Sequence, residues 1–462
     1  MRETHLRKGR QTVKLGLIKV VHDLFPDERL QTSYSILEGV YCSLYQSPLS
    51  IREVRLIEER LRAWAASRAQ IRFLRREDGY YVYQVDGLQV RAVYPAFQDT
   101  SLIEPFTIVP FSPGFIVDFG DIDRGAATPL IPPFLLSQTY ERTRRWLDNV
   151  DIEHVADLNA YISSGRALQL ITIAEALHEK QIAEIADTIL QQRRALRVLL
   201  VSGPSSSGKT SFTQRISTQL VVNGLRPVPL SLDDYFVNRA DTPRDENGDL
   251  DFERLDALDL PLLHAHIRAL IEGETVDVPS FDFVTGTRTG RTTPLGVGPS
   301  QILLIEGIHA LNPALLDRLH SNIAFRIYVS ALGGVNIDLM NRVPTTEIRL
   351  VRRMVRDHMT RGISPEETLA RWASVRRGEY ANVFRFQEQA DVMFNTSMLY
   401  ELNALRVPAE RALASIRDDS PYRETRDRLG TLLSFFEPID VSKVPFNSIL
   451  REFIGGSIYF EP

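Results

Sequence analysis

The stretch GPSSSGKT (203–210) constrains the fold of this chain more than any other part of it. It fits the pattern G-x-x-x-x-G-K-[ST], in which a glycine-rich loop wraps phosphate groups. The preceding run LRVLLVS (196–202) is apolar throughout, which is typical of a strand buried on both faces of a parallel sheet. A helical pattern follows and stops at Gly224. This order of strand, loop and helix predicts an α/β domain with a phosphate site at the loop.

Each residue type in this loop has a chemical purpose. The glycines Gly203 and Gly208 let successive backbone N–H groups point inward, the Lys209 ammonium reaches the β and γ phosphates, and the Thr210 hydroxyl coordinates Mg²⁺. ATP and Mg²⁺ are therefore the predicted cofactors. The residues predicted to bind the nucleotide are Gly203, Ser205, Ser206, Ser207, Gly208, Lys209, Thr210 and Ser211.

Two further apolar runs carry acids at their carboxyl ends, where a parallel sheet presents groups to a ligand. QILLIEGIHAL (301–311) carries Glu306, a predicted metal ligand with Thr210; the alternative is a solvated strand-end glutamate. VPLSLDDYF (228–236) ends in Asp233 and Asp234 about one βα unit after the loop, so we expect its strand to lie beside the loop strand. Asp233 is the predicted general base, with Asp234 as the alternative.

Four arginines mark the helix predicted after Pro344. Arg349, Arg352, Arg353 and Arg356 fall at i, i+3, i+4 and i+7 and so share one face. We expect the opposite, apolar face to pack and the guanidinium groups, with no acid on their own face, to be displayed toward a triphosphate. The alternative is a solvated basic face. SPEE (364–367) predicts the capped start of the next helix.

Bulk properties exclude several classes of protein. The 462 residues are too many for one ordinary domain, and 44% hydrophobic with 24% charged residues is usual for a folded globular chain. A net charge of −5 gives no basic field for nucleic acid, and we expect no membrane span. A single cysteine, Cys42, excludes an internal disulfide and favours the cytoplasm. The oligomeric state is left open, and a homo-oligomer is compatible with the sequence.

The chain divides into four predicted parts. Before the loop, a capped helix (50–68) precedes runs rich in Val and Tyr that are separated by Asp-Gly pairs, a hairpin signal. Helical spacing then continues to about residue 194. We expect an α+β domain at 1–145, a helical linker at 146–195, the nucleotide-binding domain at 196–425 and a C-terminal extension at 426–462.

The order of motifs resembles the uridine kinase and phosphoribulokinase family over about 196–416. LSLDDYF, DFERLDALD, VPSFDFVTGTR, IEGIHAL and the arginine helix carry the likeness. It is strongest to bacterial uridine kinase-like proteins with a threonyl-tRNA synthetase-like region before the kinase, as SVRRGE, ADVMFN and NSILREFIGG also indicate. The resemblance implies a P-loop kinase domain, with a parallel sheet and helices on both faces, behind a synthetase-like α+β domain. No H-x-x-x-H occurs, so we expect no zinc-dependent editing.

The resemblance also implies roles for single residues. Lys209, Asp233, Arg349 and Arg352 would be catalytic, with the arginines acting from a lid. The acceptor would meet Glu253, Phe281, Phe283, Arg288 and Arg356, with Phe281 stacking on a nucleobase. Glu253 replaces a ribose-binding aspartate of the family, and Gly286 replaces a base-contacting histidine.

The predicted function is therefore ATP-dependent phosphorylation of a nucleoside hydroxyl, the 5′-OH of uridine, cytidine or a related nucleoside. The absence of an N-K-x-D motif disfavours a switching GTPase. The alternatives are a kinase of another small alcohol, phosphoribulokinase-like or pantothenate-like, and a non-catalytic, nucleotide-regulated RNA-binding protein.

Overall fold

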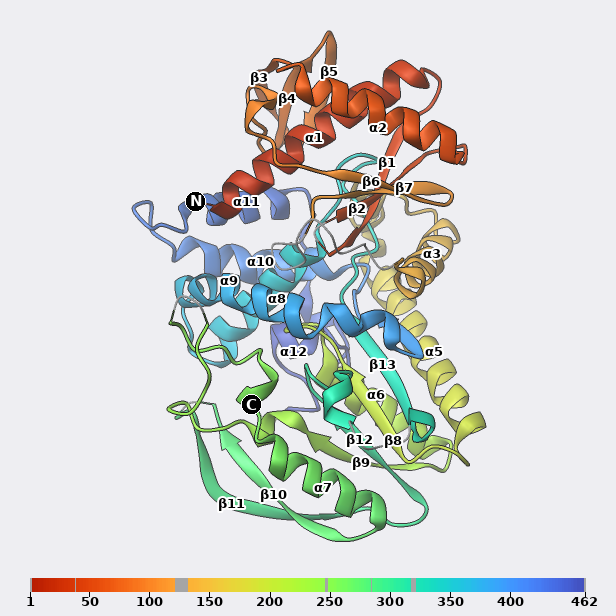
Figure 1. Ribbon diagram of the computed structural model, residues 1–462, viewed down its shortest axis with the longest axis vertical. Coiled ribbons are helices and arrows are strands. Elements are labelled where there is room, and N and C mark those ends of the chain that lie inside the picture. The colour runs from red at the N-terminus through yellow and green to blue at the C-terminus, as the bar shows by residue number, and fades with distance from the viewer. Residues whose placement is uncertain are drawn as a thin grey trace.

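The computed structural model describes residues 2–37, 39–120, 132–245, 248–283, 285–316 and 321–460. Figure 1 shows an elongated molecule with the N-terminal elements at one end and a parallel sheet with its helices toward the other. Within the described ranges, none of the helices is long and apolar enough to cross a membrane.

A five-stranded parallel sheet organises the lower part of the molecule in Figure 1. Its strands in spatial order are β14 (Val392–Asn395), β13 (Ala324–Ser330), β8 (Val198–Ser202), β12 (Gln301–Glu306) and β9 (Arg226–Ser231). Side chains on β8 alternate between two core clusters, with Leu199 and Val201 in one and Val198 and Leu200 in the other. The strand is thus buried on both faces, which explains why its sequence is apolar without interruption.

Helices cover both faces of this sheet. The first core cluster joins it to α5, α6, α8, α10 and α11, and the second joins it to α7 and α3. The helices after the N-terminal region are α3 (Phe134–Asp148), α4 (Val155–Tyr161), α5 (Ala167–Gln192), α6 (Lys209–Val222), α7 (Leu260–Glu272), α8 (Thr345–Thr360), α9 (Pro365–Asn382), α10 (Glu401–Ala414), α11 (Arg423–Ser434) and α12 (Arg451–Ile454). The predicted parallel sheet with helices on both faces is confirmed.

One predicted neighbour relation is wrong. The strand that leads to Asp233, β9, does not lie beside the loop strand β8, because β12 lies between them. Glu306 on β12 is in register with Val201 of β8 and with Ser231 of β9. A helical crossover can skip a position in a parallel sheet, and a later strand then fills the gap. Glu306 consequently lies between the loop and the strand end before Asp233.

The N-terminal region, residues 2–118, is α+β as predicted. It contains α1 (Arg2–Leu24), α2 (Ile51–Ala66) and two antiparallel sheets. One sheet has the order β1-β2-β7-β6 and the other β3-β4-β5, with bounds β1 (Leu30–Ile36), β2 (Gly39–Leu44), β3 (Ile71–Glu77), β4 (Tyr80–Val85), β5 (Leu88–Ala92), β6 (Thr107–Phe111) and β7 (Gly114–Asp118). A further hairpin, β10 (Thr275–Asp282) with β11 (Thr287–Gly296), lies at the opposite end of the molecule (Figure 1).

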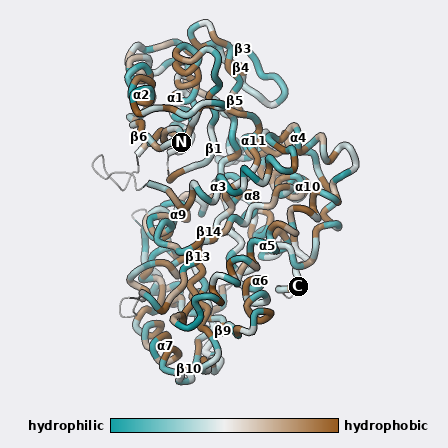
Figure 2. Tube along the Cα trace, turned by 90° about the vertical axis from the view of Figure 1, so that its right-hand side faces the viewer, coloured by the Kyte–Doolittle hydropathy of each residue, from teal (hydrophilic) through white to brown (hydrophobic). Residues whose placement is uncertain are grey.

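The N-terminal region is joined to the rest of the chain through the segment that precedes α8. The Thr32 N–H donates to Leu339 O at 2.9 Å, and the Tyr80 hydroxyl donates to Asp338 at 3.1 Å. Figure 2 shows the same arrangement from the side, with α1, α2 and β3–β5 at one end and β9, β10 and α7 at the other. The predicted domain limits stay predictions; α3 runs across 145 and α11 across 425.

Candidate active site

The phosphate-loop residues adopt a conformation that needs glycine at two places. A Cβ on Gly203 would lie 2.0 Å from the carbonyl oxygen of Val329, so no side chain fits between the loop and β13. Gly208 is the N-cap of α6 with φ +82°, a left-handed conformation that favours glycine. The loop therefore connects β8 to the N-terminus of α6, where backbone N–H groups lack helical partners and favour an anion.

Lys209, Glu306 and Asp233 interact with one another at the carboxyl edge of the sheet. Burial lowers the pKa of Lys209, while the charges of Glu306 and Asp233 raise it. Burial, then the like charge of Asp233, raises the pKa of Glu306 to about 7. The Lys209 ammonium donates to Pro204 O at 3.2 Å. One cation and two carboxylates thus share the space in front of the loop.

The same edge has oxygen ligands suited to Mg²⁺. The Thr210 hydroxyl is hydrogen-bonded to the Glu306 carboxylate, so a hydroxyl and a carboxylate already lie together. Among the described residues, no group of three or more His, Cys, Asp or Glu could hold a metal ion. An ion held by Thr210 and Glu306 would therefore complete its shell with phosphate oxygens and water, which is usual for Mg²⁺ at nucleotide sites.

Asp233 and Asp234 differ in their surroundings although they are adjacent in a short 3-10 turn, Leu232–Tyr235. The Asp234 carboxylate accepts a hydrogen bond from the backbone N–H of Phe281, which ties it to β10. Asp233 is exposed at the site; surrounding protein raises its pKa by desolvation, while Lys209, Arg361 and Arg356 act in the opposite direction. The Asp233 carboxylate is therefore accessible to a ligand, whereas the Asp234 carboxylate is engaged in a hydrogen bond that stabilises the fold.

Two of the four α8 arginines, Arg349 and Arg352, are not displayed, and for these two the sequence prediction is wrong. Arg349 and Arg352 are 1% and 0% exposed. Arg349 pairs with Glu379 of α9 and donates to the Ser205 carbonyl at 2.9 Å. The acidic partners of these guanidinium groups come from other elements. The residue pattern of α8 alone therefore does not reveal that the two arginines are buried.

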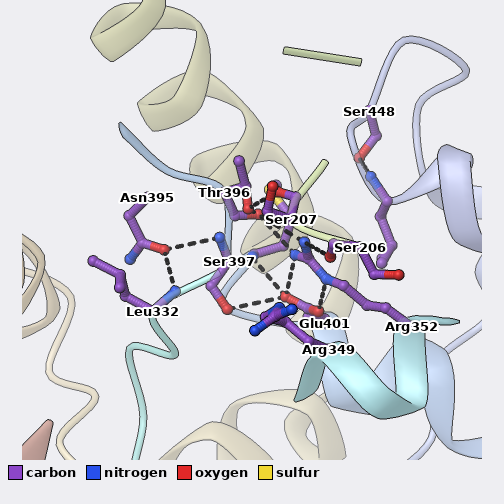
Figure 3. Close-up of polar contacts among 12 residues, drawn as sticks. Ser206, Ser207, Leu332, Arg349, Arg352, Asn395, Thr396, Ser397, Glu401 and Ser448 are labelled. Atoms are coloured by element: carbon purple, nitrogen blue, oxygen red, sulfur yellow. Dashed lines mark hydrogen bonds and ion pairs between the residues drawn. The ribbon is translucent and has the colours of Figure 1, made fainter. Parts of the chain in front are cut away.

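Arg352 completes this contact between α8 and the phosphate loop. It pairs with Glu401 at the start of α10 and donates to the Thr396 carbonyl at 2.9 Å, as Figure 3 shows. Its guanidinium also donates to the Ser206 carbonyl at 3.4 Å. The carbonyls of Ser205 and Ser206 in the loop thus bond to arginines of α8.

The other two arginines of α8 pair with one acid of the same helix, although the sequence analysis expected no acid on the arginine face. Asp357 pairs with Arg353 at 3.4 Å and with Arg356 at 2.9 Å. Arg361, just after the helix, lies 3.7 Å from the same carboxylate and is half exposed. Arg356 and Arg361 both act on the charge of Asp233, so these two arginines face the reaction site.

An aromatic wall borders the site on the side of β10. Phe281 is buried and its ring lies 5.7 Å from that of Phe236 and 5.2 Å from that of Phe283, which is 58% exposed. The Arg288 guanidinium is bound to Asp259 at 3.1 Å and to backbone carbonyls of the turn after Asp234. Arg288 therefore holds the wall in place from within the fold.

Glu253 lies between this wall and α9. A Cβ on Gly378 would lie 2.2 Å from the Cβ of Glu253, so the glycine of α9 makes room for it. Burial raises the pKa of Glu253 to about 7, against the attraction of Arg353.

Three acids of the site were missed from the sequence: Glu379, Glu401 and Glu452. Each is far along the chain from the residue it contacts, and no short-range pattern marks such a pair. SVRRGE and NSILREFIGG contain two of them, so the resemblance did point to their segments.

The central part of the chain is similar in sequence to known proteins. Residues 198–399 match the Phosphoribulokinase / Uridine kinase family. A uridine kinase of Deinococcus deserti is 30% identical over 176 residues, 38% of this chain and 75% of that protein. A uridine kinase of Chloroflexus aurantiacus is 31% identical over 198 residues, 43% and 85% of the two chains. An inorganic pyrophosphatase of Arabidopsis thaliana, TTM2, is 36% identical over 180 residues, 39% of this chain and 22% of that protein.

The family match begins at residue 198, so the synthetase resemblance of the N-terminal region stays a prediction. This chain belongs to the phosphoribulokinase and uridine kinase family and carries a P-loop kinase domain.

Proposed function

We propose that the protein transfers the γ-phosphoryl group of ATP to a hydroxyl group of a nucleoside. The observation that carries this proposal is the mutual interaction of Lys209, Glu306 and Asp233 beside the loop. A kinase needs a cation for the transferred group, a metal ligand and a base for the acceptor, and these residues have the required chemistry.

Different residues of the chain have different roles in the proposed phosphoryl transfer. Asp233 accepts the proton of the acceptor hydroxyl, whose oxygen forms the new bond to the γ phosphorus as the bond to the β-phosphate oxygen breaks. Lys209 and the loop N–H groups stabilise the charge on the transferred group and on the ADP that leaves. Thr210 and Glu306 would hold Mg²⁺, which would supply positive charge to the nucleotide phosphates.

The wall of Phe281, Phe283 and Phe236 favours a planar base as part of the acceptor, because aromatic faces stack on flat rings. The carboxylates of Glu253 and Asp233 can accept hydrogen bonds from hydroxyl groups of a sugar. Both features suit an uncharged nucleoside better than a sugar phosphate.

The position of Gly286 distinguishes this pocket from that of a typical uridine kinase. Gly286 has φ +71°, and a Cβ there would lie 2.5 Å from the Arg239 side chain. Arg239 also donates to the Phe283 carbonyl at 3.3 Å. Arg239 therefore occupies the space that a side chain at 286 would need, so the preferred base is expected to differ from uracil.

An acceptor panel tests the proposal. Purified full-length protein with ATP and Mg²⁺ is offered pyrimidine nucleosides, purine nucleosides, ribulose 5-phosphate and pantothenate, and ADP release is measured. We expect turnover with at least one nucleoside and none in Lys209→Ala, which lacks the cation for the transferred group. Turnover with ribulose 5-phosphate or pantothenate alone would contradict the nucleoside assignment, and none with any acceptor would contradict a kinase of these compounds.

A further inference from the structure

The C-terminal segment, residues 441–460, folds back onto the phosphate loop. Ile449, Leu450 and Phe453 of this segment belong to the core cluster that contains β8 and α6. The Arg352 guanidinium lies 4.7 Å from the centre of the Phe453 ring. A Cβ on Gly208 would lie 2.7 Å from Ile449, so the segment touches the loop itself.

The segment places one carboxylate on the N-terminus of α6. Glu452 Oε2 accepts from the Ser211 hydroxyl at 2.7 Å and from the Ser211 backbone N–H at 3.3 Å. Ser211 is the third residue of α6 after its N-cap, so its N–H has no partner within the helix. Such N–H groups of a phosphate loop are the ones that bind nucleotide phosphates. Glu452 thus accepts a hydrogen bond from an N–H group that the phosphate-loop pattern predicts to bind a nucleotide phosphate.

Charges around Glu452 indicate that it lies inside the phosphate site. Its charge attracts Lys209 and Arg361 and repels Glu306, so all three groups lie within reach of it. Lys209 is therefore surrounded by Glu306, Asp233 and Glu452. A nucleotide brings several negative charges to the same place, and two anions cannot share one set of donors without repulsion.

We propose that Glu452 sets the affinity for nucleotide phosphates by acting as a built-in competitor for the Ser211 donors. The C-terminal segment is then an autoinhibitory strap, and ATP binds by displacing the Glu452 side chain from α6. This inference rests on the proposed use of the loop for ATP, but not on the identity of the acceptor.

The variant Glu452→Gln tests this inference, because glutamine keeps the shape of the side chain and removes its charge. Binding of ATP and of tripolyphosphate to the full chain is measured by calorimetry without any acceptor. We expect both to bind roughly tenfold more tightly to the variant, the effect of one hydrogen bond to a charged group. Glu437→Gln, an exposed acid on the same C-terminal part, is the control and should bind both probes as the wild type does.

Thermal unfolding of Glu452→Gln without ligand checks that this variant is folded. Glu452→Asp is a second variant, whose shorter side chain cannot reach Ser211 in the same way. It is also expected to bind ATP and tripolyphosphate more tightly than the wild type. Unchanged or weaker ATP binding in both variants would overturn the inference. A gain for ATP without a gain for tripolyphosphate would also overturn it, since the effect would then arise at the nucleoside part. Failure of the wild type and both variants to bind either probe would contradict the proposed function itself.

Discussion

Desolvation by the surrounding protein raises the pKa of three carboxyl groups of the site: Asp233, Glu306 and Glu253. Their neighbours differ, so their expected uses differ as well. Asp233 faces Lys209 and two arginines that favour its charged form, which a general base needs. Glu306 is bonded to Thr210, which suits a metal ligand. Glu253 lies against α9, where burial disfavours its ionised form and Arg353 and its own backbone N–H favour it.

Asp233→Asn is expected to slow phosphoryl transfer roughly 10²- to 10⁴-fold at saturating substrates, the range for loss of a general base. ATP affinity should stay near that of the wild type, because asparagine keeps the shape of the side chain. Steady-state kinetics and direct ATP binding measure the two effects separately. Weaker ATP and Mg²⁺ binding at an unchanged saturated rate would make Asp233 a metal ligand instead.

Glu253→Gln is expected to stabilise the ligand-free protein at pH 8 and to leave its stability unchanged near pH 4. The folded-state pKa of about 7 exceeds the ordinary value of 4.5, so ionisation costs stability as the pH rises between those values. Removing the charge should recover about 2 kcal/mol above pH 7, allowing for the solvent that reaches the side chain. Urea unfolding at both pH values measures this.

The exposed Glu272, at the end of α7, offers the matched control. Glu272→Gln should change stability little at either pH. An equal gain at pH 4 and pH 8 for Glu253→Gln would show that packing, and not charge, causes its effect.

At the scale of elements, α8 is a support for the phosphate loop. One side of the helix packs into the core through Leu350, Val351 and Met354. The other side bonds to the carbonyls of Ser205 and Ser206 through buried arginines. Since these arginines are paired by Glu379 and Glu401, three helices and the loop form one connected polar network.

Glu379→Gln is expected to destabilise the protein by roughly 3 kcal/mol, because Arg349 would keep a buried charge without its partner. The bond from the Ser205 N–H to residue 379, 2.7 Å in the wild type, should weaken because an amide oxygen is a weaker acceptor than a carboxylate, and this should loosen the loop. Thermal unfolding and the KM for ATP measure these effects, and we expect the KM to rise.

The nearby Glu366→Gln on the same helix is the control for this variant and should change both quantities little. If Glu379→Gln lowers stability while the KM for ATP stays at the wild-type value, the pair supports the fold without positioning the loop.

Local signals predicted many elements correctly. Capping boxes at Ser50 and Ser364 begin α2 and α9 as expected, because the bonds of a capping box lie within four residues. The Asp78-Gly79 and Asp86-Gly87 pairs form the turns of β3-β4-β5, with positive φ at all four residues. The burial of Arg349 and Arg352 was missed because their partners lie 30 and 49 residues away.

At the scale of the molecule, Glu347 on α8 links three parts of the chain. It is fully buried and pairs with Arg7 of α1 and Arg428 of α11. Burial by itself would raise the pKa of Glu347, but Arg428 and Arg7 together lower it to about 2. The helix that supports the loop is thereby tied to both the N-terminal region and the C-terminal helices.

Arg7→Ala is expected to destabilise the protein by about 2 kcal/mol at pH 7, since Glu347 would keep one of its two partners. The difference in unfolding free energy between Arg7→Ala and the wild type should shrink as the pH falls from about 4.5 toward 2. The ion pair stabilises the fold only while the Glu347 carboxylate is ionised, and Glu347 becomes protonated over this range. Urea unfolding across this range measures it. Lys8→Ala, on the same helix, is the control; an Arg7→Ala difference that persists at pH 2 would contradict the ionic origin.

The sequence by itself determined the phosphate loop, the strand before it, the acids at the strand ends and the capped helices. Those features depend on residues adjacent in the chain or on the periodicity of one element. Only the tertiary structure decided that β12 lies between β8 and β9, that the α8 arginines face buried glutamates, and that Glu452 reaches Ser211. Such contacts join residues tens to hundreds of positions apart, and burial of charge there depends on which elements meet in space.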